Sequence, residues 1–515
     1  MPRPPRKRII AAMRRRLLVG LVTVLLVSAT TSVVHAVTPR RVGSLALHRC
    51  RLGVAAWCGS LHVPLDYTDA SAGTIRIGFG WLPARGRPTG TVVAEEGGPG
   101  YPSTGTAADY AAMLGGLRRH RNLLVVDARG TGRSTPLDCR SLQWLRVPSP
   151  RIPSRVAACG QQLDHTFRRA DGSYVHASDL FTTANTARDL ARVLDALGLG
   201  TVDLYGDSYG TYVAQSFLSR YPGRLRSVVL DSAYEARDLD PWYRTTPTTA
   251  HRAFDIVCRR AAHCHGSTWR RLGRTVRRLR RHHDGRDVTA LVNIVNDAGY
   301  DTYPYEHLDP ALRAYLRHGD LRALRRLYAR DIAEDYSDYV RTPASYYSDG
   351  LYFAVACSDY PQLFDMGAAP AQRRQQLDAS IAALPADTFA PFTTREWLRM
   401  LPYTETYTAC LDWPTPTHAA DPPVPDGASM DATGVPVLVL NGELDSLTPA
   451  VGGAHVAAQI GPAAQAYVAA NNVHLVALDA TTCGARVVRR FLTDPRRRPR
   501  AGCLGRIPAL RVARG

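Results

Sequence analysis

An apolar segment runs directly into Gly206-Asp207-Ser208-Tyr209-Gly210, and a helical segment follows at once. Residues 201–205 (TVDLY) have the composition of a buried strand, and residues 211–221 (TYVAQSFLSRY) have helical periodicity. A serine between two glycines at such a junction predicts a sharp turn that lifts the hydroxyl out of a sheet. This junction therefore favours a parallel sheet with the serine at the carboxyl end of a central strand.

Further strand and helix patterns alternate along the chain. Residues 122–127 (NLLVVD) are apolar on both sides, which indicates a central strand of a parallel sheet. We also expect a helix at 184–197 and strands at 74–82, 91–95, 227–230 and 435–440. Strands that alternate with helices predict an α/β fold with a mostly parallel, doubly wound sheet.

The chain divides into four parts on this pattern. Residues 1–36 are an export signal, and residues 37–232 form the first part of the α/β core. Residues 233–432 are rich in Arg and Tyr and mainly helical, and strands resume after them, so we interpret them as an inserted cap. Residues 433–515 complete the core.

The first 36 residues have the three parts of a secretory signal. A basic start precedes the apolar segment LLVGLVTVLLV, and SATTSVVHA then ends in small residues at Ala36. This order predicts cleavage after Ala36 and a secreted or cell-envelope protein without a stable membrane span. Two alternatives stay open: the segment acts as an uncleaved signal anchor, or Arg14-Arg15-Arg16 directs the twin-arginine route.

Ten cysteines follow the signal, and an even count in an exported chain predicts disulfides. The simplest pairing joins neighbours: Cys50–Cys58, Cys139–Cys159, Cys258–Cys264, Cys357–Cys410 and Cys483–Cys503. Cys258, His263, Cys264 and His265 form an alternative metal knuckle. We expect no metal there, because no second ligand pair stands at a zinc-type spacing.

The formal net charge is +19, which raises the question of a nucleic-acid partner. Of the 64 basic residues, Lys7 is the sole lysine and 63 are arginines. Selection for phosphate binding would use both residue types, so this bias is more typical of codon usage. We expect no nucleic-acid partner, and the sequence carries no signal for an oligomeric state.

A serine becomes a nucleophile only with an adjacent base that is itself held by an acid. Asp445 follows the strand at 435–440, at the sheet edge where Ser208 is expected. His474 comes 29 residues later, after a strand-like segment. The order Ser, acid, His is the one this fold class uses, so we predict a Ser208–Asp445–His474 triad.

The loop Glu96-Gly97-Gly98-Pro99-Gly100 directly follows a strand and predicts an oxyanion hole. The expected donors are backbone N–H groups of this loop and the N–H of Tyr209, the residue after the nucleophile. Every group in this set is a side chain or a backbone amide, so we expect no cofactor.

The motifs EGGPG, DARGTGRS, GDSYG and GELDSLTP, with the late histidine and the last two cysteines, resemble the exported α/β-hydrolases related to proline iminopeptidase. The similarity is greatest to their secreted tripeptidyl aminopeptidase branch. It implies a serine exopeptidase that releases short peptides or proline from free N-termini. By this resemblance Ser208, Asp445 and His474 are the triad, and Gly98 and Tyr209 are the oxyanion donors. Two departures are Glu96, where many relatives have His, and Asn472-Val473, where the family has a Gly beside the histidine.

An aminopeptidase must bind a free ammonium group, which calls for unpaired carboxylates near the site. Glu95 and Glu96 are the acids nearest the predicted oxyanion loop. The main alternative is an exported carboxylesterase or lipase with the same triad, which would ignore the free N-terminus. A non-catalytic binding protein on the same scaffold would require a broken triad, and the candidate set is complete.

Overall fold

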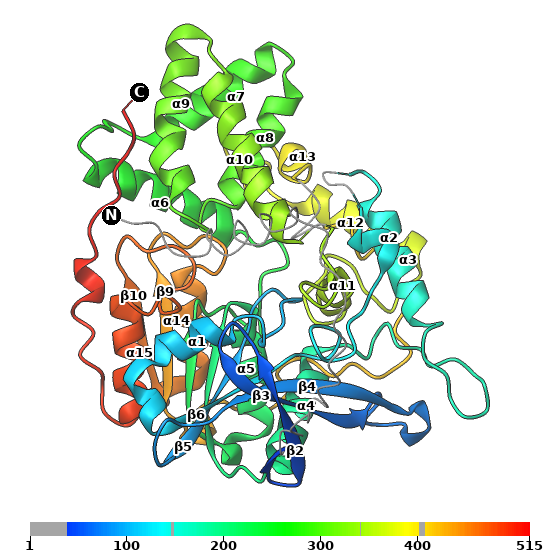
Figure 1. Cartoon of the computed structure of the whole chain (residues 1–515). Coiled ribbons are helices and arrows are strands. Elements are labelled where there is room, and N and C mark those ends of the chain that lie inside the picture. The colour runs from blue at the N-terminus through cyan, green and yellow to red at the C-terminus, as the bar shows by residue number, and fades with distance from the viewer. Residues whose placement is uncertain (1–38, 146–148, 340, 401–406, 515) are drawn as a thin grey trace, which may run out of the picture.

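The computed structural model describes residues 39–145, 149–339, 341–400 and 407–514 (Figure 1). The expected signal at 1–36 lies outside these residues. The strands are β1 (Arg40–Val42), β2 (Leu45–Arg51), β3 (Ala55–Pro64), β4 (Thr74–Leu82), β5 (Gly90–Glu95), β6 (Arg121–Val126), β7 (Val202–Asp207), β8 (Leu225–Asp231), β9 (Val437–Gly442) and β10 (Ala464–Ala469).

The helices follow the same numbering along the chain. They are α1 (Ala107–Leu114), α2 (Arg140–Gln143), α3 (Ile152–Leu163), α4 (Thr183–Ala196), α5 (Tyr209–Arg220), α6 (Thr245–Arg260), α7 (Thr268–Arg281), α8 (Gly285–Asn296), α9 (Tyr303–His318), α10 (Arg322–Tyr339), α11 (Asp349–Ser358), α12 (Pro370–Ala383), α13 (Thr394–Trp397), α14 (Ala450–Ile460) and α15 (Cys483–Thr493). Within the described residues, no helix is long and apolar enough to cross a membrane.

All ten strands form one sheet in the order β1-β2-β3-β4-β6-β5-β7-β8-β9-β10. From β6 to β10 every neighbouring pair is parallel, which confirms the mostly parallel α/β sheet. The first four strands pair antiparallel and extend the sheet at one edge. Three of these strands, β1 to β3, lie in residues 40–64, where no strand was predicted from the sequence.

Helices cover both faces of the sheet. Successive residues of a strand point to opposite faces, so neighbouring residues of one strand pack against different helices. Val93 and Leu204 belong to the same apolar cluster as residues of α4 and α5. Their strand neighbours Val92 and Tyr205 belong to a second cluster with residues of α1 and α15. The doubly wound arrangement that we expected is thus present, with the central strand β7 buried along its full length.

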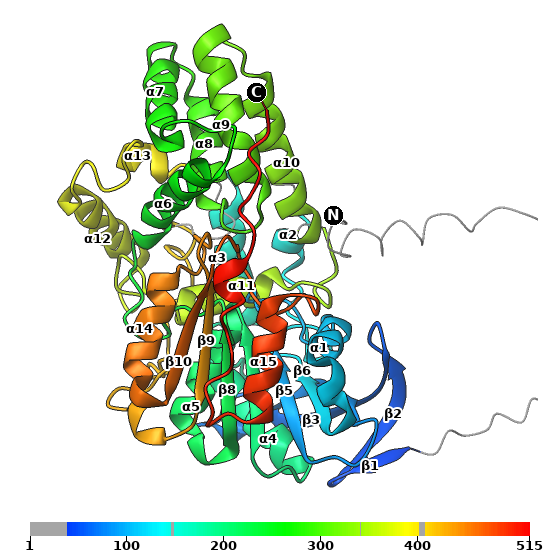
Figure 2. The same cartoon turned by 90° about the vertical axis from the view of Figure 1, so that its left-hand side faces the viewer.

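The helices α6 to α13 lie between β8 and β9 in the chain, in the stretch where we expected an inserted helical cap. The word cap below is a name for this stretch, α6 to α13 and the segments that join them. The helices α6 to α10 stand together above one end of the sheet (Figure 1). The C-terminal segment climbs from α15 toward these helices (Figure 2). Its Ile507 carbonyl accepts a bond from Asn471 Nδ2 at 2.7 Å, and its Ala513 N–H donates to the Glu306 carbonyl at 2.9 Å.

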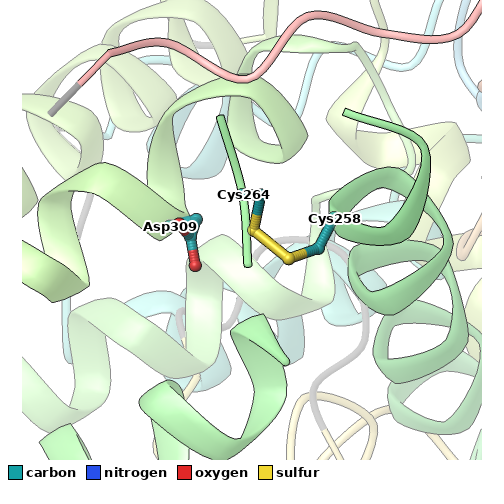
Figure 3. Close-up of side chains that lie close together, drawn as sticks. All are labelled: Cys258, Cys264 and Asp309. Carbon is teal, nitrogen blue, oxygen red and sulfur yellow. A yellow bond between two sulfur atoms is a disulfide. The ribbon is translucent and has the colours of Figure 1, made fainter. Parts of the chain in front are cut away.

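Five disulfides join the same neighbouring cysteines that we paired from the sequence. Such a set is typical of proteins that fold in an oxidising compartment. Cys258, Cys264 and Asp309 come close together, but a disulfide consumes both sulfurs (Figure 3). Asp309 is paired with Arg271 at 2.6 Å and Arg313 at 3.0 Å. This donor set does not suit a metal ion, because disulfide sulfurs are poor ligands and two arginines occupy the carboxylate.

Candidate active site

The chain turns sharply at Ser208, between the end of β7 and the start of α5. Ser208 has φ 50° and ψ −122°, a conformation that side chains rarely adopt. The flanking glycines permit the turn: a Cβ on Gly206 would lie 2.2 Å from the Gly210 carbonyl oxygen, and one on Gly210 would lie 2.2 Å from the Glu95 carbonyl oxygen. The turn therefore holds a half-buried serine at the end of a buried strand.

Asp445 and His474 form a buried pair. His474 Nδ1 lies 2.9 Å from Asp445 Oδ2, and Thr448 Oγ1 donates to the same carboxylate oxygen at 2.7 Å. The other oxygen, Oδ1, accepts the backbone N–H groups of Leu447 at 3.0 Å and Thr448 at 2.9 Å. Four donors thus surround a carboxylate with no solvent exposure and fix its orientation.

The end of β8 joins the Ser208 turn to the loop that carries His474. The backbone carbonyl of Asp231 accepts the Ser208 N–H at 2.9 Å. The Asp231 carboxylate accepts the backbone N–H groups of Val476 and Ala477, both at 2.8 Å, and Ser232 Oγ accepts that of Leu475 at 2.8 Å. Asp231 thus fixes the serine turn and the histidine loop in one frame. Asp231 was not among the residues predicted from the sequence.

Burial raises the pKa of the Asp231 carboxyl, and its hydrogen bonds act in the opposite direction. Tyr205 donates a further bond to Asp231 Oδ2 at 2.8 Å. The signal for this residue in the sequence is an acid directly after the apolar run SVVL. That signal is weak, because a carboxylate at a strand end has many ordinary structural roles.

A turn of the cap is seated on the loops that carry Asp445 and His474. The Gly299 carbonyl accepts the backbone N–H of His474 at 2.9 Å, and the Gly299 N–H donates to Ser446 Oγ at 2.9 Å. A Cβ on Gly299 would lie 2.1 Å from the Ser446 nitrogen, so only glycine allows this approach. The ring of Tyr300, which is 43% exposed, lies 5.8 Å from the His474 ring, centroid to centroid.

A second cap contact reaches the same two loops from α6. Arg260 Nη1 donates to Glu443 Oε2 at 2.5 Å and to Asn471 Oδ1 at 2.7 Å. Glu443 precedes Asp445 by two residues, and Asn471 precedes His474 by three. The cap therefore braces the acid and histidine loops at two points, which the sequence could not show because the cap residues lie far away along the chain.

The predicted oxyanion loop lies directly against the serine. A Cβ on Gly97 would lie 2.7 Å from Ser208 Cβ and 3.2 Å from its Oγ. Gly98 follows with φ 119°, a value that only glycine adopts readily, and Tyr209 is the first residue of α5. The Gly100 carbonyl accepts the N–H of Ser348, so α11 holds the far end of the loop. Both expected donors thus belong to segments that flank Ser208.

The structure corrects the expectation that Glu95 binds substrate. Glu95 is the last residue of β5, is only 3% exposed and accepts a bond from Ser103 Oγ at 3.4 Å. A carboxylate buried in this way is closed to a substrate ammonium group. Glu96 is half-buried, and its Oε2 accepts the Tyr110 hydroxyl at 3.1 Å. Glu96 therefore stays the better candidate of the two, although it already has a donor.

Glu95 also makes a testable contribution to stability. Burial raises the pKa of this carboxyl well above its usual range, and the nearby charge of Asp127 raises it further. The folded protein thus keeps a proton that the unfolded chain loses above about pH 4.5. Stability then falls as the pH rises from that value toward the folded pKa. Glu95→Gln, which has the shape of the protonated acid and does not titrate, should remove this loss.

Thermal unfolding of wild type and Glu95→Gln between pH 4.5 and 8.5 measures this effect. We expect the unfolding temperature of the variant minus that of wild type to increase as the pH rises. Asp109→Asn, on the exposed face of α1, is the matched control and should give a constant difference. If the difference in unfolding temperature between Glu95→Gln and wild type did not grow with pH, the proposal that folded Glu95 keeps its proton would be wrong.

A pocket lies between α11 and two other cap segments, with a volume of about 450 Å³ that includes space open to solvent. Its lining residues are Pro241, Tyr243, Tyr352, Phe353, Ala356, Tyr360, Pro361, Gln362, Leu363, Tyr407, Ala409 and Cys410. Tyrosines connect its wall to the serine turn: Tyr360 and Tyr234 share a hydrogen bond of 2.8 Å, and Tyr234 stacks on Tyr212, which stacks on Tyr209. This pocket is mostly aromatic and apolar.

Comparison with known families gives a match over most of the chain. The family described as alpha/beta hydrolase fold matches residues 90–481. This range includes the Ser208 turn, the Asp445 and His474 loops and the intervening cap.

Three curated relatives have names that state a hydrolytic activity. Tripeptidyl aminopeptidase of Streptomyces lividans is 28% identical over 200 residues, 36% of this chain and 37% of that protein. Serine protease Hip1 of Mycobacterium bovis is 27% identical over 198 residues, 35% of this chain and 36% of that protein. Carboxylesterase B of Mycobacterium tuberculosis is 26% identical over 472 residues, 85% of this chain and 84% of that protein. The chain spans about two-fifths of the length of the first relatives it matches.

Solved structures with similarity to this chain include hydrolases of more than one kind. A proline iminopeptidase of Mycobacterium smegmatis has a TM-score of 0.37 and is 16% identical, covering 84% of this chain and 98% of its own. An esterase of Thermogutta terrifontis has a TM-score of 0.36 and is also 16% identical, with the same coverage.

Proposed function

The chain belongs to the α/β-hydrolase fold family, and on this premise we propose that it is an exported serine aminopeptidase that forms an acyl-enzyme on Ser208. One observation carries the proposal. Asp231 links the backbone of Ser208 to the loop of His474, and His474 in turn pairs with the buried Asp445. A nucleophile, a base and an acid held in one rigid frame are what acyl transfer requires.

The proposed first step is attack of Ser208 Oγ on the scissile carbonyl carbon. His474 takes the hydroxyl proton on Nε2, because Nδ1 is engaged by Asp445, and the charged carboxylate stabilises the imidazolium. The N–H groups of Gly98 and Tyr209 stabilise the oxyanion of the tetrahedral intermediate. The C–N bond then breaks, and the imidazolium gives its proton to the departing amine.

The second step returns the enzyme to its starting state. His474 takes a proton from water, and the hydroxide formed attacks the carbonyl of the acyl-enzyme ester. The ester bond breaks, Ser208 Oγ regains its proton from the imidazolium, and a carboxylic acid is released. Both steps use only protein groups, the substrate and one water molecule, so the reaction as proposed balances without a cofactor.

Peptide substrates with free N-termini are the proposed class. The similarity to tripeptidyl aminopeptidase and to the Hip1 protease supports this choice. The pocket beside α11 suits an apolar or aromatic side chain of the acyl part, and Glu96 is the acid we propose for the ammonium group. The five disulfides support export to an oxidising compartment, with residues 1–36 as the signal and residues 233–432 as the cap.

A carboxylesterase is the second candidate, and one observation favours it. Among the relatives described above, carboxylesterase B of Mycobacterium tuberculosis aligns over 85% of this chain, whereas the peptidases align over about a third. The same serine, histidine and acid would cleave an ester by the same two steps.

Matched substrates separate the two activities. Proline, alanine and tripeptide p-nitroanilides, each with a free and an acetylated N-terminus, are compared with p-nitrophenyl butyrate. We expect the free tripeptide or proline anilide to be cleaved at least about tenfold faster than its acetylated form, since a buried ammonium–carboxylate contact contributes about 1.5–3 kcal/mol. Ester turnover without any cleavage of the anilides would select the carboxylesterase.

A further inference from the structure

The Tyr300 side chain lies beside the His474 imidazole, on a turn that links α8 to α9. The two ring centroids are 5.8 Å apart and the ring planes make an angle of 30°. The His474 side chain is only 7% exposed, whereas Tyr300 is 43% exposed. An aromatic surface is therefore open to solvent next to a buried imidazole.

The position of Tyr300 relative to this imidazole is fixed by its neighbours. The preceding residue, Gly299, is bonded through its carbonyl to the His474 N–H and through its N–H to Ser446 Oγ. The Tyr300 N–H closes the turn on the Asp297 carbonyl at 2.9 Å. Tyr305 lies in the first turn of α9, and its hydroxyl donates a hydrogen bond to the Leu444 carbonyl at 2.6 Å. These bonds tie both sides of Tyr300 to the acid and histidine loops.

The proposed mechanism indicates which part of the substrate lies near Tyr300. The imidazolium must hand its proton to the departing atom, so that atom lies within about 2.6–3.2 Å of His474 Nε2 when the bond breaks. A side chain beside the imidazole then borders the space that the leaving group occupies. The acyl part of the substrate stays on Ser208 and has no need of this surface.

We propose that Tyr300 binds the leaving-group part of the substrate, the residue that follows the scissile bond, and that it favours an aromatic or apolar residue there. Stacked or edge-on aromatic contacts supply the selectivity. This proposal rests on the proposed acyl-enzyme function. It adds a consequence: amines that carry an aromatic group should bind at Tyr300 and attack the carbonyl carbon of the acyl-enzyme. The new C–N bond forms as the ester bond to Ser208 Oγ breaks, and His474 takes the amine proton and passes it to Ser208 Oγ.

The test uses the full protein and one acyl group with two leaving groups, phenylalanine amide and glycine amide. For Tyr300→Ala we expect kcat/KM to fall about tenfold with phenylalanine amide and by less than about twofold with glycine amide. Tyr300→Phe should keep the preference, because the ring and not the hydroxyl makes the contact. Tyr174→Ala, which removes a tyrosine of 40% exposure away from the site, is the matched control and should change neither substrate.

A second readout separates leaving-group binding from a general structural role. With saturating substrate and added phenylalanine amide, Tyr300→Ala should lower the ratio of aminolysis to hydrolysis and leave the hydrolysis rate of the acyl-enzyme unchanged. Equal losses with both leaving groups, or a slower hydrolysis of the acyl-enzyme, would overturn the assignment of Tyr300. Full turnover by Ser208→Ala would instead overturn the acyl-enzyme itself, so the two failures are distinguishable.

Discussion

Ser208→Ala is expected to lower kcat by about 10⁵- to 10⁶-fold, because every later step depends on the bond that this oxygen forms. The change removes one half-buried hydroxyl and leaves the backbone contacts of the turn in place, above all the bond from the residue 208 N–H to the Asp231 carbonyl. Turnover of the best anilide or ester substrate measures the loss. Circular dichroism and the unfolding temperature should stay close to those of wild type.

The matched control for this change is Ser219→Ala, near the end of α5, the helix that follows Ser208. Ser219 Oγ donates to the Ser216 carbonyl at 2.9 Å, away from the proposed reacting atoms. We expect this variant to keep most of the activity. If Ser208→Ala retained even a hundredth of the wild-type rate with an intact fold, a different nucleophile would have to be sought.

Asp445→Asn is expected to cost about 10⁴-fold in kcat, for a reason that the local donors make specific. Asp445 Oδ1 faces the N–H groups of Leu447 and Thr448, and Oδ2 faces Thr448 Oγ1 and His474 Nδ1. In all four contacts the oxygen of residue 445 must accept a hydrogen bond. An amide nitrogen on either side therefore meets donors, and the side facing His474 would force the wrong imidazole tautomer.

The rate of Asp445→Asn should be measured at several pH values, with the exposed Asp479→Asn as control. Asp479 accepts from Thr481 in the segment that follows His474, and its loss should change the rate by less than about twofold. A rate for Asp445→Asn within tenfold of wild type would show that another acid orients the histidine.

Local patterns made the serine turn predictable. Gly206 is required by a contact within the strand–turn–helix unit itself, so the sequence around Ser208 is enough to mark the turn. Gly210 is required by the close approach of β5 at Glu95, but it belongs to the same short motif. The central strands were predictable for a similar reason, since burial on both faces leaves a continuous apolar run in β7 and β9. Four of the five disulfides likewise join cysteines only 6 to 20 residues apart, whereas Cys357 and Cys410 are 53 residues apart.

Contacts between distant segments were not predictable. Gly299 reaches His474 across 175 residues of chain, and nothing in the sequence around either residue marks the contact. The inward direction of Glu95 was missed because proximity to the glycine loop suggested a binding role, whereas β5 is buried up to this last residue. The strands β1 to β3 escaped prediction because few of their residues are buried, and because β1 and β2 also contain arginines.

The bond between the Gly299 carbonyl and the His474 N–H has a consequence for protein engineering. A cap that only rested on the core could be exchanged for that of another hydrolase to transfer its preferences. Here part of the support of the histidine is encoded in the cap itself, so a wholesale exchange would remove it together with the old selectivity. Grafts that keep Arg260 and residues 297–305, and change the rest of the cap helices, are the ones we expect to retain activity.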